Sequence, residues 1–414
     1  MNKLDELIQQ LCPNGVPYRR LGDIATICRG GSFQKKDFTE SGVPCIHYGQ
    51  IYTRYGLFVN ETITYIGEET AQKQKFAEPN DVVMAVTSEN IEDVCKCVAW
   101  LGDGKVAVSG HAAIIHHSMN PKYLVYWLHS SSFYQQKAKI ANGTKVIEVA
   151  PAKLSDVVLP VPPLEVQREI VRILDTFTEL TAELTAELTA RQKQYEYYRD
   201  MLLSFGENGG GETGNNINFF LVAEIADTNI GLATTVTKYK ANQGVLLIHN
   251  SDIQENEIVL KQHEYITEAF AEKNHKKRLQ ENDVITVHTG DVGTSAVISK
   301  EYAGAIGFTT ITSRIRNPQK VLPEYFCHYL NSHRCKAEIA SMTISDRSNL
   351  NQNCFEKLRI PIPPIDEQRR IVTILDHFST LCTDLSSGLP AEIEARQKQY
   401  EYYRDNLLSF TPAD

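Results

Sequence analysis

Residues 181–200 read TAELTAELTARQKQYEYYRD, and the last eleven residues of this stretch return unchanged at 395–405. The unit Thr-Ala-Glu-Leu is repeated in front of the first copy alone. These residues favour helix, and apolar side chains around them recur every three or four positions, as on one face of a helix. The pattern predicts a helix from about Leu164 to Ser204, whose apolar stripe needs a partner helix. The stripe consists of Ile170, Leu174, Phe177, Leu180, Leu184 and Leu188.

The repetition extends over the whole chain. Internal repeats of this length indicate two copies of one folding unit. The matching pairs are SGVPCIHYGQI (41–51) with QGVLLIHNSDI (243–253), PNDVVMAVT (79–87) with ENDVITVHT (281–289), and LPVPPLEVQREIVRILDTF (159–177) with IPIPPIDEQRRIVTILDHF (360–378).

Each half has the same order of predicted elements. Short β-branched runs, separated by Gly and Asn-Asp turns, are followed by one amphipathic helix near 121–139 or 323–340. A pair of prolines then precedes each long helix. We therefore predict an α+β fold in which two similar globular α/β domains, in a pseudo-twofold arrangement, are separated by two long helical regions packed as an antiparallel coiled coil. The expected boundaries are a first domain at 1–160, a helical spacer at 161–205, a flexible linker at 206–216, a second domain at 217–361 and a second helical spacer at 362–414.

The second helical spacer differs from the first at the position of the Thr-Ala-Glu-Leu unit. Gly388 and Pro390 stand there, in the stretch SSGLPAEIEARQ. We expect the helix to break at this point, with Pro390 in the first turn of a new helix.

The composition predicts a folded, reduced protein. No apolar run approaches the length of a membrane span, and the N-terminus lacks the apolar core of a signal peptide, so we expect a cytoplasmic protein. Nine cysteines without a Cys-x-x-Cys pair argue against a metal site and a disulfide framework. The net charge is −9, but the excess acid falls in the helical segments 151–214 and 359–414. Each globular block can therefore present a basic face to nucleic acid.

Motifs of the common catalytic sites are absent from the sequence. It contains no GxxxxGK[ST] phosphate loop, no GxGxxG after a strand, no HExxH, and no Asn-Pro-Pro-Tyr or Asp-Pro-Pro-Tyr. We interpret His116 and His117 as structural residues rather than metal ligands. The chain is expected to be non-catalytic and to hold neither a metal nor a cofactor.

A duplicated domain on paired helices has the geometry with which symmetric dimers read two DNA half-sites. The loops of the two copies differ, so the two domains would read two different half-sites. RGGSFQKKDF (29–38) corresponds to NIGLATTVTKYKAN (229–242), and NGTKVIEVAPA (142–152) corresponds to MTISDRSNLNQN (342–353).

The order of these features resembles the specificity subunit of type I restriction–modification enzymes. A variable block is followed by PPxxxQxxIVxILDxF, a helix and RQKQYEYYRDxLLSF, and then all of it recurs; the repeated Thr-Ala-Glu-Leu resembles that of the IC group. The resemblance covers nearly the whole chain. It implies that the blocks are target recognition domains, each reading one half of a bipartite, asymmetric site in double-stranded DNA. It further implies that the helices set the spacing and dock two modification (methyltransferase) subunits, with restriction/translocase subunits completing the complex.

The resemblance also implies where cofactors belong and what the repeated unit does. S-adenosylmethionine would be bound by the modification subunit, and ATP and Mg by the restriction subunit. Within the family, the number of Thr-Ala-Glu-Leu units is associated with the length of the unread spacer between half-sites. One unit adds about 6 Å and about 40° of helical rotation, while one base pair advances B-DNA by about 3.4 Å. A change of one unit is therefore of the size that shifts the spacer by about one base pair.

The candidate DNA contacts are basic and polar residues in the loops that differ between the blocks. Polar side chains that follow the matched strands 79–87 and 281–289 are of types that read base edges, and the basic residues suit phosphates. A solvated turn, or a charged surface helix end at 272–278, is the alternative for these residues. The predicted set is Arg29, Gln34, Lys35, Lys36, Thr87, Ser88, Asn90, Thr144 and Lys145 in the first block, and Lys238, Tyr239, Lys240, Lys276, Lys277, Arg278, Thr289, Arg347, Ser348, Asn349 and Asn351 in the second.

The tyrosines of the duplicated helix ends are identical in both copies, whereas base-reading surfaces should differ. We therefore predict that they pack helices or dock partners rather than stack on bases. The residues assigned to helix packing or subunit docking are Leu174, Leu184, Leu188, Tyr195, Tyr198, Leu375, Tyr400 and Tyr403.

Two other functions stay open at the level of the sequence. One is a structural adaptor that clamps partner proteins through its helix pair and binds peptides with its blocks. The other is a self-sufficient methyltransferase, against which the missing cofactor and catalytic motifs argue.

Overall fold

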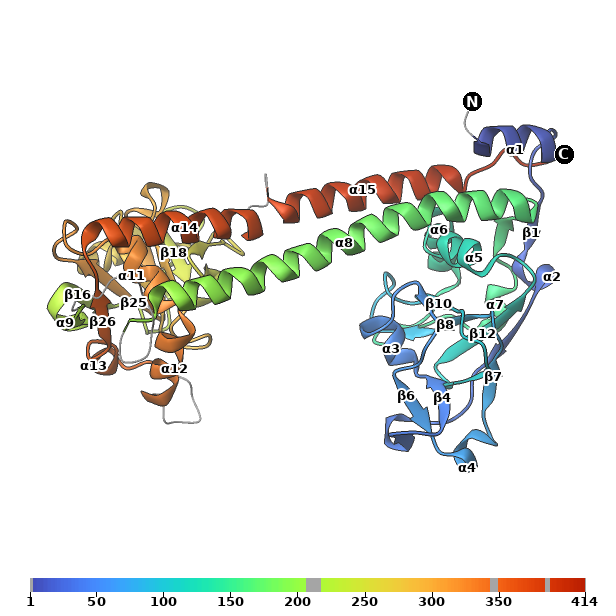
Figure 1. Cartoon of the computed structure of the whole chain (residues 1–414), viewed down its shortest axis with the longest axis horizontal. Helices are drawn as coiled ribbons and strands as arrows, with labels where there is room; N and C mark the ends of the chain where they lie inside the picture. Colours follow the sequence, from blue (N-terminus) through green and yellow to red (C-terminus); the bar gives the residue numbers. More distant parts are fainter. Residues whose placement is uncertain (1–2, 206–216, 343–348, 384–387, 414) are drawn as a thin grey trace. The chain divides into compact units, whose positions relative to one another are not determined.

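The computed structural model describes residues 3–205, 217–342, 349–383 and 388–413 (Figure 1). Contacts within the chain divide it into two units, one of residues 1–184 and 392–414, and the other of residues 185–391. Each unit joins one globular domain to helical segments from both halves of the sequence. Both domains mix strands and helices, so the predicted α+β class is confirmed.

Two five-stranded sheets form the globular domain of unit 1. In spatial order, the first contains β2 (Ala25–Arg29), β12 (Ala112–His117), β8 (Val82–Ala85), β10 (Cys97–Trp100) and β5 (Phe58–Val59), and the second contains β3 (Phe38–Thr39), β6 (Thr64–Ile66), β4 (Val43–Ile46), β11 (Val106–Val108) and β7 (Lys75–Ala77). Successive residues of a strand point to opposite faces. Val82 and Met84 of β8 thus face the cluster that includes the domain's helices, while Val83 and Ala85 face the second sheet.

Unit 2 repeats this plan with four strands in each sheet. The first contains β16 (Ala226–Ile230), β25 (Thr310–Ile315), β22 (Val284–Val287) and β23 (Ser295–Val297), and the second contains β17 (Lys240–Ala241), β21 (Tyr265–Ile266), β18 (Val245–His249) and β24 (Ile306–Phe308). The central strand β22 is buried along its whole length, as β8 is in unit 1. The sequence repeat is therefore a repeat of the fold.

Four two-stranded sheets complete the domains. In the first two, β1 (Tyr18–Arg20) pairs with β14 (Val158–Pro160), and β15 (Asn218–Leu221) pairs with β26 (Arg359–Ile362), so the first and last strands of each domain close it. The others are β9 (Thr87–Ser88) with β13 (Ile147–Glu148), and β19 (Ile253–Gln254) with β20 (Glu257–Ile258).

Short helices connect the strands. They are α1 (Lys3–Leu11), α2 (Leu21–Ile24), η1 (Lys35–Asp37), α3 (Tyr48–Thr53), α4 (Glu68–Ala71) and α7 (Pro151–Leu154) in unit 1, and α9 (Val222–Ile225), η2 (Thr237–Tyr239), η3 (Asn250–Asp252), α10 (Glu268–Lys273), η4 (His275–Lys277), η5 (Lys300–Tyr302) and α13 (Gln352–Phe355) in unit 2.

Two helices stand where one amphipathic helix was predicted in each half. They are α5 (Pro121–Leu128) and α6 (Ser131–Ile140) in unit 1, and α11 (Pro323–Leu330) and α12 (His333–Met342) in unit 2. A serine starts each second helix: the Ser130 hydroxyl accepts from the Phe133 amide, and the Ser332 hydroxyl accepts from the Cys335 amide. Such N-caps favour a new helix over continuation of the old one, so the prediction of one helix was wrong.

The long helices follow the prediction closely. Helix α8 (Leu164–Leu203) is continuous over 40 residues. The second half has two helices instead, α14 (Ile365–Thr383) and α15 (Leu389–Leu407), and Pro390 is the second residue of α15, as expected for a helix start. Matched glutamines hold the helix starts: Gln167 Nε2 donates to the Pro162 carbonyl at 2.7 Å, and Gln368 Nε2 to the Pro363 carbonyl at 2.8 Å.

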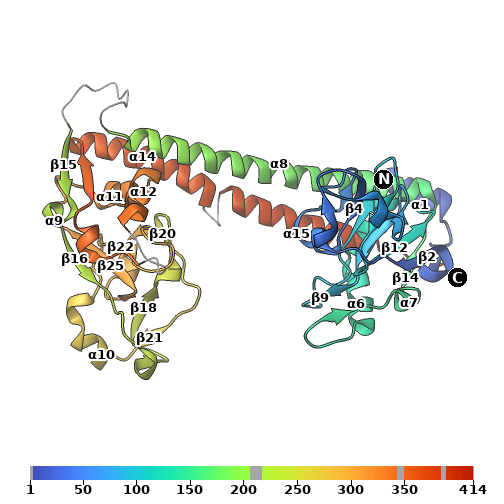
Figure 2. The ribbon, with the colours of Figure 1, turned by 90° about the horizontal axis from the view of Figure 1, so that it is seen from below.

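Within each unit, helix segments from the two halves pack in an antiparallel pair. In unit 1, α15 lies along the first half of α8 and runs in the opposite direction (Figures 1 and 2). The rings of Phe177 and Tyr403 stack there with centroids 5.2 Å apart, and those of Tyr198 and Phe378 stack in unit 2 at 5.4 Å. These contacts explain the duplicated helix ends, because each end packs against the helix start of the other half.

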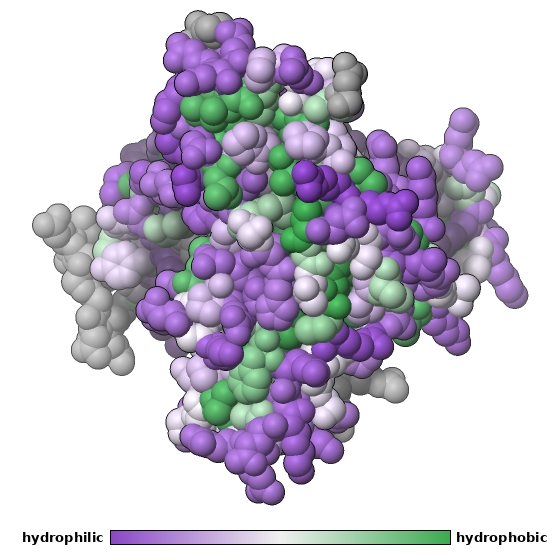
Figure 3. All heavy atoms as spheres, turned by 90° about the vertical axis from the view of Figure 1, so that its right-hand side faces the viewer, coloured by the Kyte–Doolittle hydropathy of each residue, from purple (hydrophilic) through white to green (hydrophobic). Residues whose placement is uncertain are grey.

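Hydrophilic side chains cover much of the face of unit 1 seen in Figure 3, and hydrophobic ones form separate patches. Within the described ranges, no helix is both long enough and apolar enough to cross a membrane. The eight cysteines described by the structure are free thiols, and six of them are buried.

Candidate nucleic-acid interface

The structure brings two predicted DNA-contact segments of the first domain together. Strand β9 carries Thr87 and Ser88, and it pairs with β13 so that Ser88 lies opposite Ile147. The loop before β13 carries Thr144 and Lys145, both exposed. Segments almost sixty positions apart in the sequence therefore form one polar edge, which we call edge 1 and define as Arg29, Thr87, Ser88, Thr144, Lys145 and Glu148.

Arg29 joins edge 1 from the end of β2. Its guanidinium forms an ion pair with Glu148, and the two side chains are 47% and 46% exposed. The sequence reasoning selected Arg29 but missed Glu148. The partnership of these two residues is a tertiary contact across 119 positions, which no local pattern in the sequence indicates.

Aromatic residues extend edge 1, and the sequence reasoning missed them too. His111 Nδ1 lies 3.3 Å from the Thr87 hydroxyl, and the His111 ring lies 5.0 Å from the ring of Tyr48. Tyr52 donates to the Thr87 carbonyl at 2.8 Å. A signal was present in the repeat, because the matched stretches IHYGQI and IHNSDI differ at Tyr48 and Asn250 while keeping the residues before them.

The predicted cluster Gln34, Lys35 and Lys36 lies on η1, where all three side chains are exposed. Gln34 caps this short helix, and its backbone amide donates to the Asp37 carboxylate at 2.8 Å. Burial and the nearby Lys35 charge lower the pKa of His47 to about 4. His47 is therefore neutral near pH 7, and the positive charge of this region comes from the lysines.

Asn90 has a local structural role. Its side chain accepts from the Asp93 amide at 2.7 Å and donates to the Asp93 carboxylate at 2.8 Å. These two bonds fix the turn after β9. They do not place Asn90 in direct contact with the other residues of edge 1.

The second domain has a corresponding polar edge, edge 2, formed by Asn250, His288, Thr289 and Asn349. Thr289 bridges to Asn349 and donates to its Oδ1 at 2.8 Å. Asn250 donates to the Thr289 carbonyl at 2.6 Å, and His288 Nδ1 lies 2.8 Å from the Thr289 hydroxyl. Thr289 thus holds the position in edge 2 that Thr87 holds in edge 1.

The remaining candidates of the second domain fall into separate groups. Tyr239 stacks on Phe270 with centroids 3.8 Å apart, and Lys240 pairs with Glu264 at 2.7 Å. Lys238 precedes them on η2 and is exposed. Asn351 caps α13 by accepting from the Asn353 amide at 2.8 Å. Arg347 and Ser348 lie outside the described residues.

The basic run at 276–278 lines a cavity of about 180 Å³ beside β16, together with Asn229 and Arg314. Lys277 Nζ donates to the Ile230 and Gly231 carbonyls at 2.5 and 2.8 Å, and burial lowers its pKa. Arg278 pairs with Glu268. Two of these three cations therefore stabilise the fold, while Lys276 is exposed.

The duplicated helix ends bury part of their side chains and expose the rest. Leu174, Leu375, Tyr195 and Tyr400 are buried, while Leu184 and Leu188 are half-buried. Tyr197 and Tyr402, which occupy the same position in the two copies, are 65% and 66% exposed. Tyr198 is half-buried and Tyr403 is 40% exposed, although each stacks on a phenylalanine of the other half. Each unit therefore also presents a largely exposed tyrosine, Tyr197 or Tyr402, to solvent.

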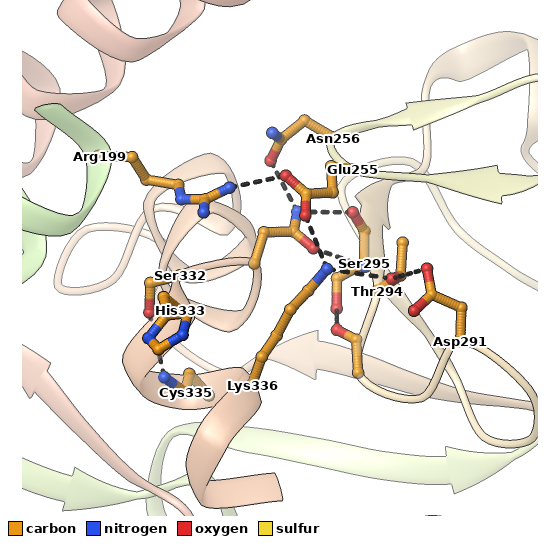
Figure 4. A network of polar contacts seen from close by, with 12 residues as sticks. Arg199, Glu255, Asn256, Asp291, Thr294, Ser295, Ser332, His333, Cys335 and Lys336 are labelled. Atoms are coloured by element: carbon orange, nitrogen blue, oxygen red, sulfur yellow. Dashed lines mark hydrogen bonds and ion pairs between the residues drawn. The ribbon is translucent and has the colours of Figure 1, made fainter. Parts of the chain in front are cut away.

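In unit 2, a polar network ties the end of α8 to the globular domain (Figure 4). Arg199 is 5% exposed, and its guanidinium lies 2.6 Å from the Glu255 carboxylate, which also binds Lys336 at 2.7 Å. Asn256 donates to the Tyr195 hydroxyl at 3.0 Å.

The histidines predicted to be structural have structural partners. His116 Nδ1 lies 2.6 Å from the Asp81 carboxylate, and His117 Nδ1 accepts from the Met119 amide at 3.2 Å. Among the described residues, no group of three or more His, Cys, Asp or Glu is arranged to hold a metal ion. The polar edges offer hydrogen-bond donors, acceptors and charge, which are the groups that proteins use to contact DNA.

Comparison with known proteins identifies the family. The sequence profile described as the type I restriction modification DNA specificity domain matches residues 13–191 and again 216–395. The chain belongs to this family. It is a DNA sequence-recognition subunit of the type I restriction–modification class and is not itself catalytic, as the resemblance in sequence predicted.

Relatives and solved structures agree with this assignment. The chain is 35% identical over 302 residues to the EcoR124I/EcoR124II specificity subunit of Escherichia coli, covering 70% of each protein. It is 32% identical over 327 residues to a putative type I restriction enzyme specificity subunit of Haemophilus influenzae, covering 74% of this chain and 77% of that one.

Two solved structures share the fold over 96% of this chain. One, from work on the assembly and conformational transition of a type I system, has a TM-score of 0.66 at 18% identity and is covered over 98% of its length. The other, the type I S subunit of M. genitalium, has a TM-score of 0.52 at 15% identity and is covered over 96%. The duplicated domain with long helices is thus the fold of this family of specificity subunits.

Proposed function

We propose that each globular domain reads one half of a bipartite, asymmetric DNA site, and that edges 1 and 2 are the surfaces that face the bases. The observation that carries this proposal is the pair of equivalent edges. Both are built on a threonine that follows the central strand, and both present different side chains around it: Arg29 and Glu148 in one, Asn250 and Asn349 in the other. Two domains that recognise different DNA sequences need equivalent backbone positions that carry different side chains.

The exposed lysines near these edges have the complementary role of contacting phosphates. Lys145 belongs to edge 1, Lys35 and Lys36 are exposed on η1 of the same domain, and Lys238 and Lys276 are exposed in the second domain. Phosphate contacts position a protein on DNA without reading sequence. Lys240 and Arg278 are less available for phosphate contacts, because each already forms an ion pair, with Glu264 and Glu268 respectively.

The helical regions in this proposal set the unread spacer and dock two modification subunits. Tyr197 and Tyr402 support the second role, because identical exposed aromatic residues at two equivalent positions suit two copies of one partner. The modification subunits would bind S-adenosylmethionine, and restriction/translocase subunits would bind ATP and Mg. Such a complex works on chromosomal or invading DNA, which places the protein in the cytoplasm.

A methylation map tests this proposal. The chain is co-expressed with its modification subunit in a host free of DNA methylation, and modified adenines are located by single-molecule sequencing. We expect a split motif, with two short specified blocks on either side of a fixed run of unread bases. A soluble complex without any motif would contradict the proposal and favour the adaptor, which the comparisons do not support.

The positions of the edges are tested by two charge removals in the same assay. We expect Lys145→Ala to lower the methylation rate at all sites without changing the motif, because a phosphate contact carries no sequence information. Removal of Lys105, which pairs with Glu78 at 2.7 Å elsewhere on the first domain, is the matched control and should leave the rate unchanged.

A further inference from the structure

Arg29 and Glu148 form an ion pair within edge 1. Arg29 ends β2, and Glu148 ends β13 opposite Thr87. Their ion pair leaves each side chain about half exposed, so each keeps hydrogen-bonding groups available to a ligand.

A carboxylate at a DNA-facing edge needs a partner on the DNA. Double-stranded DNA carries one phosphate charge per about 1.7 Å of its axis, so a surface that follows the backbone favours cations and neutral donors. Arg29 neutralises Glu148 in part. The groups on DNA that favour a carboxylate are the amino groups of bases, above all N4 of cytosine.

The order of donors and acceptors in the ion pair matches one base pair. In the major groove, a G·C pair presents the acceptors N7 and O6 of guanine, followed by the N4 donor of cytosine. A guanidinium beside a carboxylate presents donors followed by an acceptor. The guanidinium donors can therefore face N7 and O6 of guanine while the carboxylate faces N4 of cytosine. An A·T pair presents an acceptor, a donor and an acceptor, so its amino group would meet the guanidinium. We propose that Arg29 and Glu148 together read one G·C base pair in the half-site of the first domain; this inference rests on the role proposed above for edge 1.

The same place in the second domain carries different groups on the same frame. Ile230 ends β16 where Arg29 ends β2, and Asn349 meets Thr289 where Glu148 meets Thr87. No guanidinium–carboxylate pair can form between Ile230 and Asn349. Among the described residues at this place, the match to a G·C pair belongs to the first domain, which predicts that its loss changes one half of the motif and leaves the other half intact.

Glu148→Gln tests the inference in the complex with the modification subunit. Glutamine keeps the shape and one acceptor but adds a donor, so it tolerates the thymine O4 that a carboxylate rejects. We expect one G·C position, in one half of the methylated motif, to become degenerate, with discrimination there falling about five- to 150-fold, the equivalent of about 1–3 kcal/mol. Arg29→Ala should relax the same position.

The matched control is Asp156→Asn, which removes the exposed ion pair between Arg20 and Asp156, at 3.8 Å, from the same domain. Its motif should equal that of the wild type. A Glu148→Gln motif identical to the wild type would overturn the inference. So would a uniform loss of methylation at all sites with the complex and its thermal unfolding midpoint intact, because that result assigns the pair to phosphate binding.

Lys145→Ala separates a failure of this inference from a failure of the proposed interface. If Lys145→Ala lowers the rate while Glu148→Gln leaves the motif unchanged, edge 1 contacts DNA and only the assignment to a G·C pair is wrong. If both variants match the wild type in rate and motif, edge 1 does not face DNA.

Discussion

Arg199 and Arg404 occupy the same place in two identical stretches, yet their surroundings differ. Arg199 binds Glu255 of the second domain at 2.6 Å, whereas Arg404 pairs with its neighbour Asp405 at 3.0 Å. The first domain offers Arg404 no counterpart of Glu255. The equivalent position of that domain carries Thr53 instead of a glutamate.

This difference predicts unequal costs for the same substitution. Arg199→Ala leaves a half-buried Glu255 with Lys336 as its remaining ionic partner, so we expect it to lower the free energy of unfolding by about 1–3 kcal/mol. Arg404→Ala loses its ion pair with the adjacent Asp405 and its place over the Tyr400 ring, a contact that Arg199 also makes with Tyr195, so it should cost less than Arg199→Ala. Chemical denaturation of the two variants measures the difference. Equal costs would show that the network in unit 2 adds nothing to the docking of the helix end.

His129 predicts a pH dependence for unit 1. Burial lowers its pKa to about 4, although its Nδ1–H donates to the Val125 carbonyl at 2.8 Å. The pKa of an unfolded histidine is about 6.5. Between these values, as pH falls, the unfolded chain takes up a proton that the folded chain does not, so stability is lost from about pH 6.5 down to about pH 4.

The repeat offers the matched variant, because Asn331 stands at the equivalent position of the second domain. His129→Asn removes one group that binds a proton in the unfolded chain only. Between pH 6.5 and 4, we therefore expect the free energy of unfolding to fall less steeply with pH, by up to about 1.4 kcal/mol per pH unit. Thermal unfolding across this range measures the slope. An unchanged slope would mean that His129 titrates alike in the folded and unfolded chain.

Single residues also show how far the sequence could predict the interface. Thr87 and Thr289 could be found because the repeat aligns them. Glu148 could not, because its relation to Arg29 is a contact between β13 and β2 that no local pattern encodes. Lys277 was predicted from the density of basic residues, but charge density does not tell a surface cation from one that donates to the carbonyls of Ile230 and Gly231.

At the scale of elements, it was easier to predict that a segment is helical than to predict where one helix ends and the next begins. The period of apolar residues gave α8 within one residue at its C-terminal end, because 40 residues of regular pattern leave little ambiguity. The same period runs through Ser130 and Ser332, where the chain starts a new helix. The capping serines were the local signal there, and amphipathic periodicity alone could not reveal it.

Helix α8 carries the prediction for the spacer. Deleting Thr181–Leu184 removes about 6 Å of helix and about 40° of rotation. The deleted residues are half-buried or exposed and lie outside both globular domains. We expect the methylated motif to keep both specified halves and to lose about one base pair of the unread run. A changed base within either half would contradict the separation of spacing from reading.

The same helix offers a control for that deletion. Replacing the second Thr-Ala-Glu-Leu unit, residues 185–188, by Ala-Ala-Glu-Leu keeps the length and the apolar Leu188 of the stripe. The motif of this variant should equal that of the wild type. Any change of its spacer would mean that side-chain identity, rather than helix length, sets the spacing.

At the scale of the whole molecule, the repeat predicts two readers that can be exchanged. Tyr18 pairs with Pro160 at the base of the first domain, and Phe219 pairs with Pro361 at the base of the second. These matched strand pairs define equivalent cutting points, so residues 219–361 can replace residues 18–160 without altering the helical regions.

A methylation map of this exchanged chain, co-expressed with the modification subunit, tests whether each domain reads its own half-site. We expect a motif whose two halves are the same sequence read on opposite strands, as the predicted pseudo-twofold arrangement requires, with both halves equal to the one that the second domain reads in the wild type. A folded, active complex whose motif keeps the original first half would contradict this account, because recognition would then lie outside the globular domains.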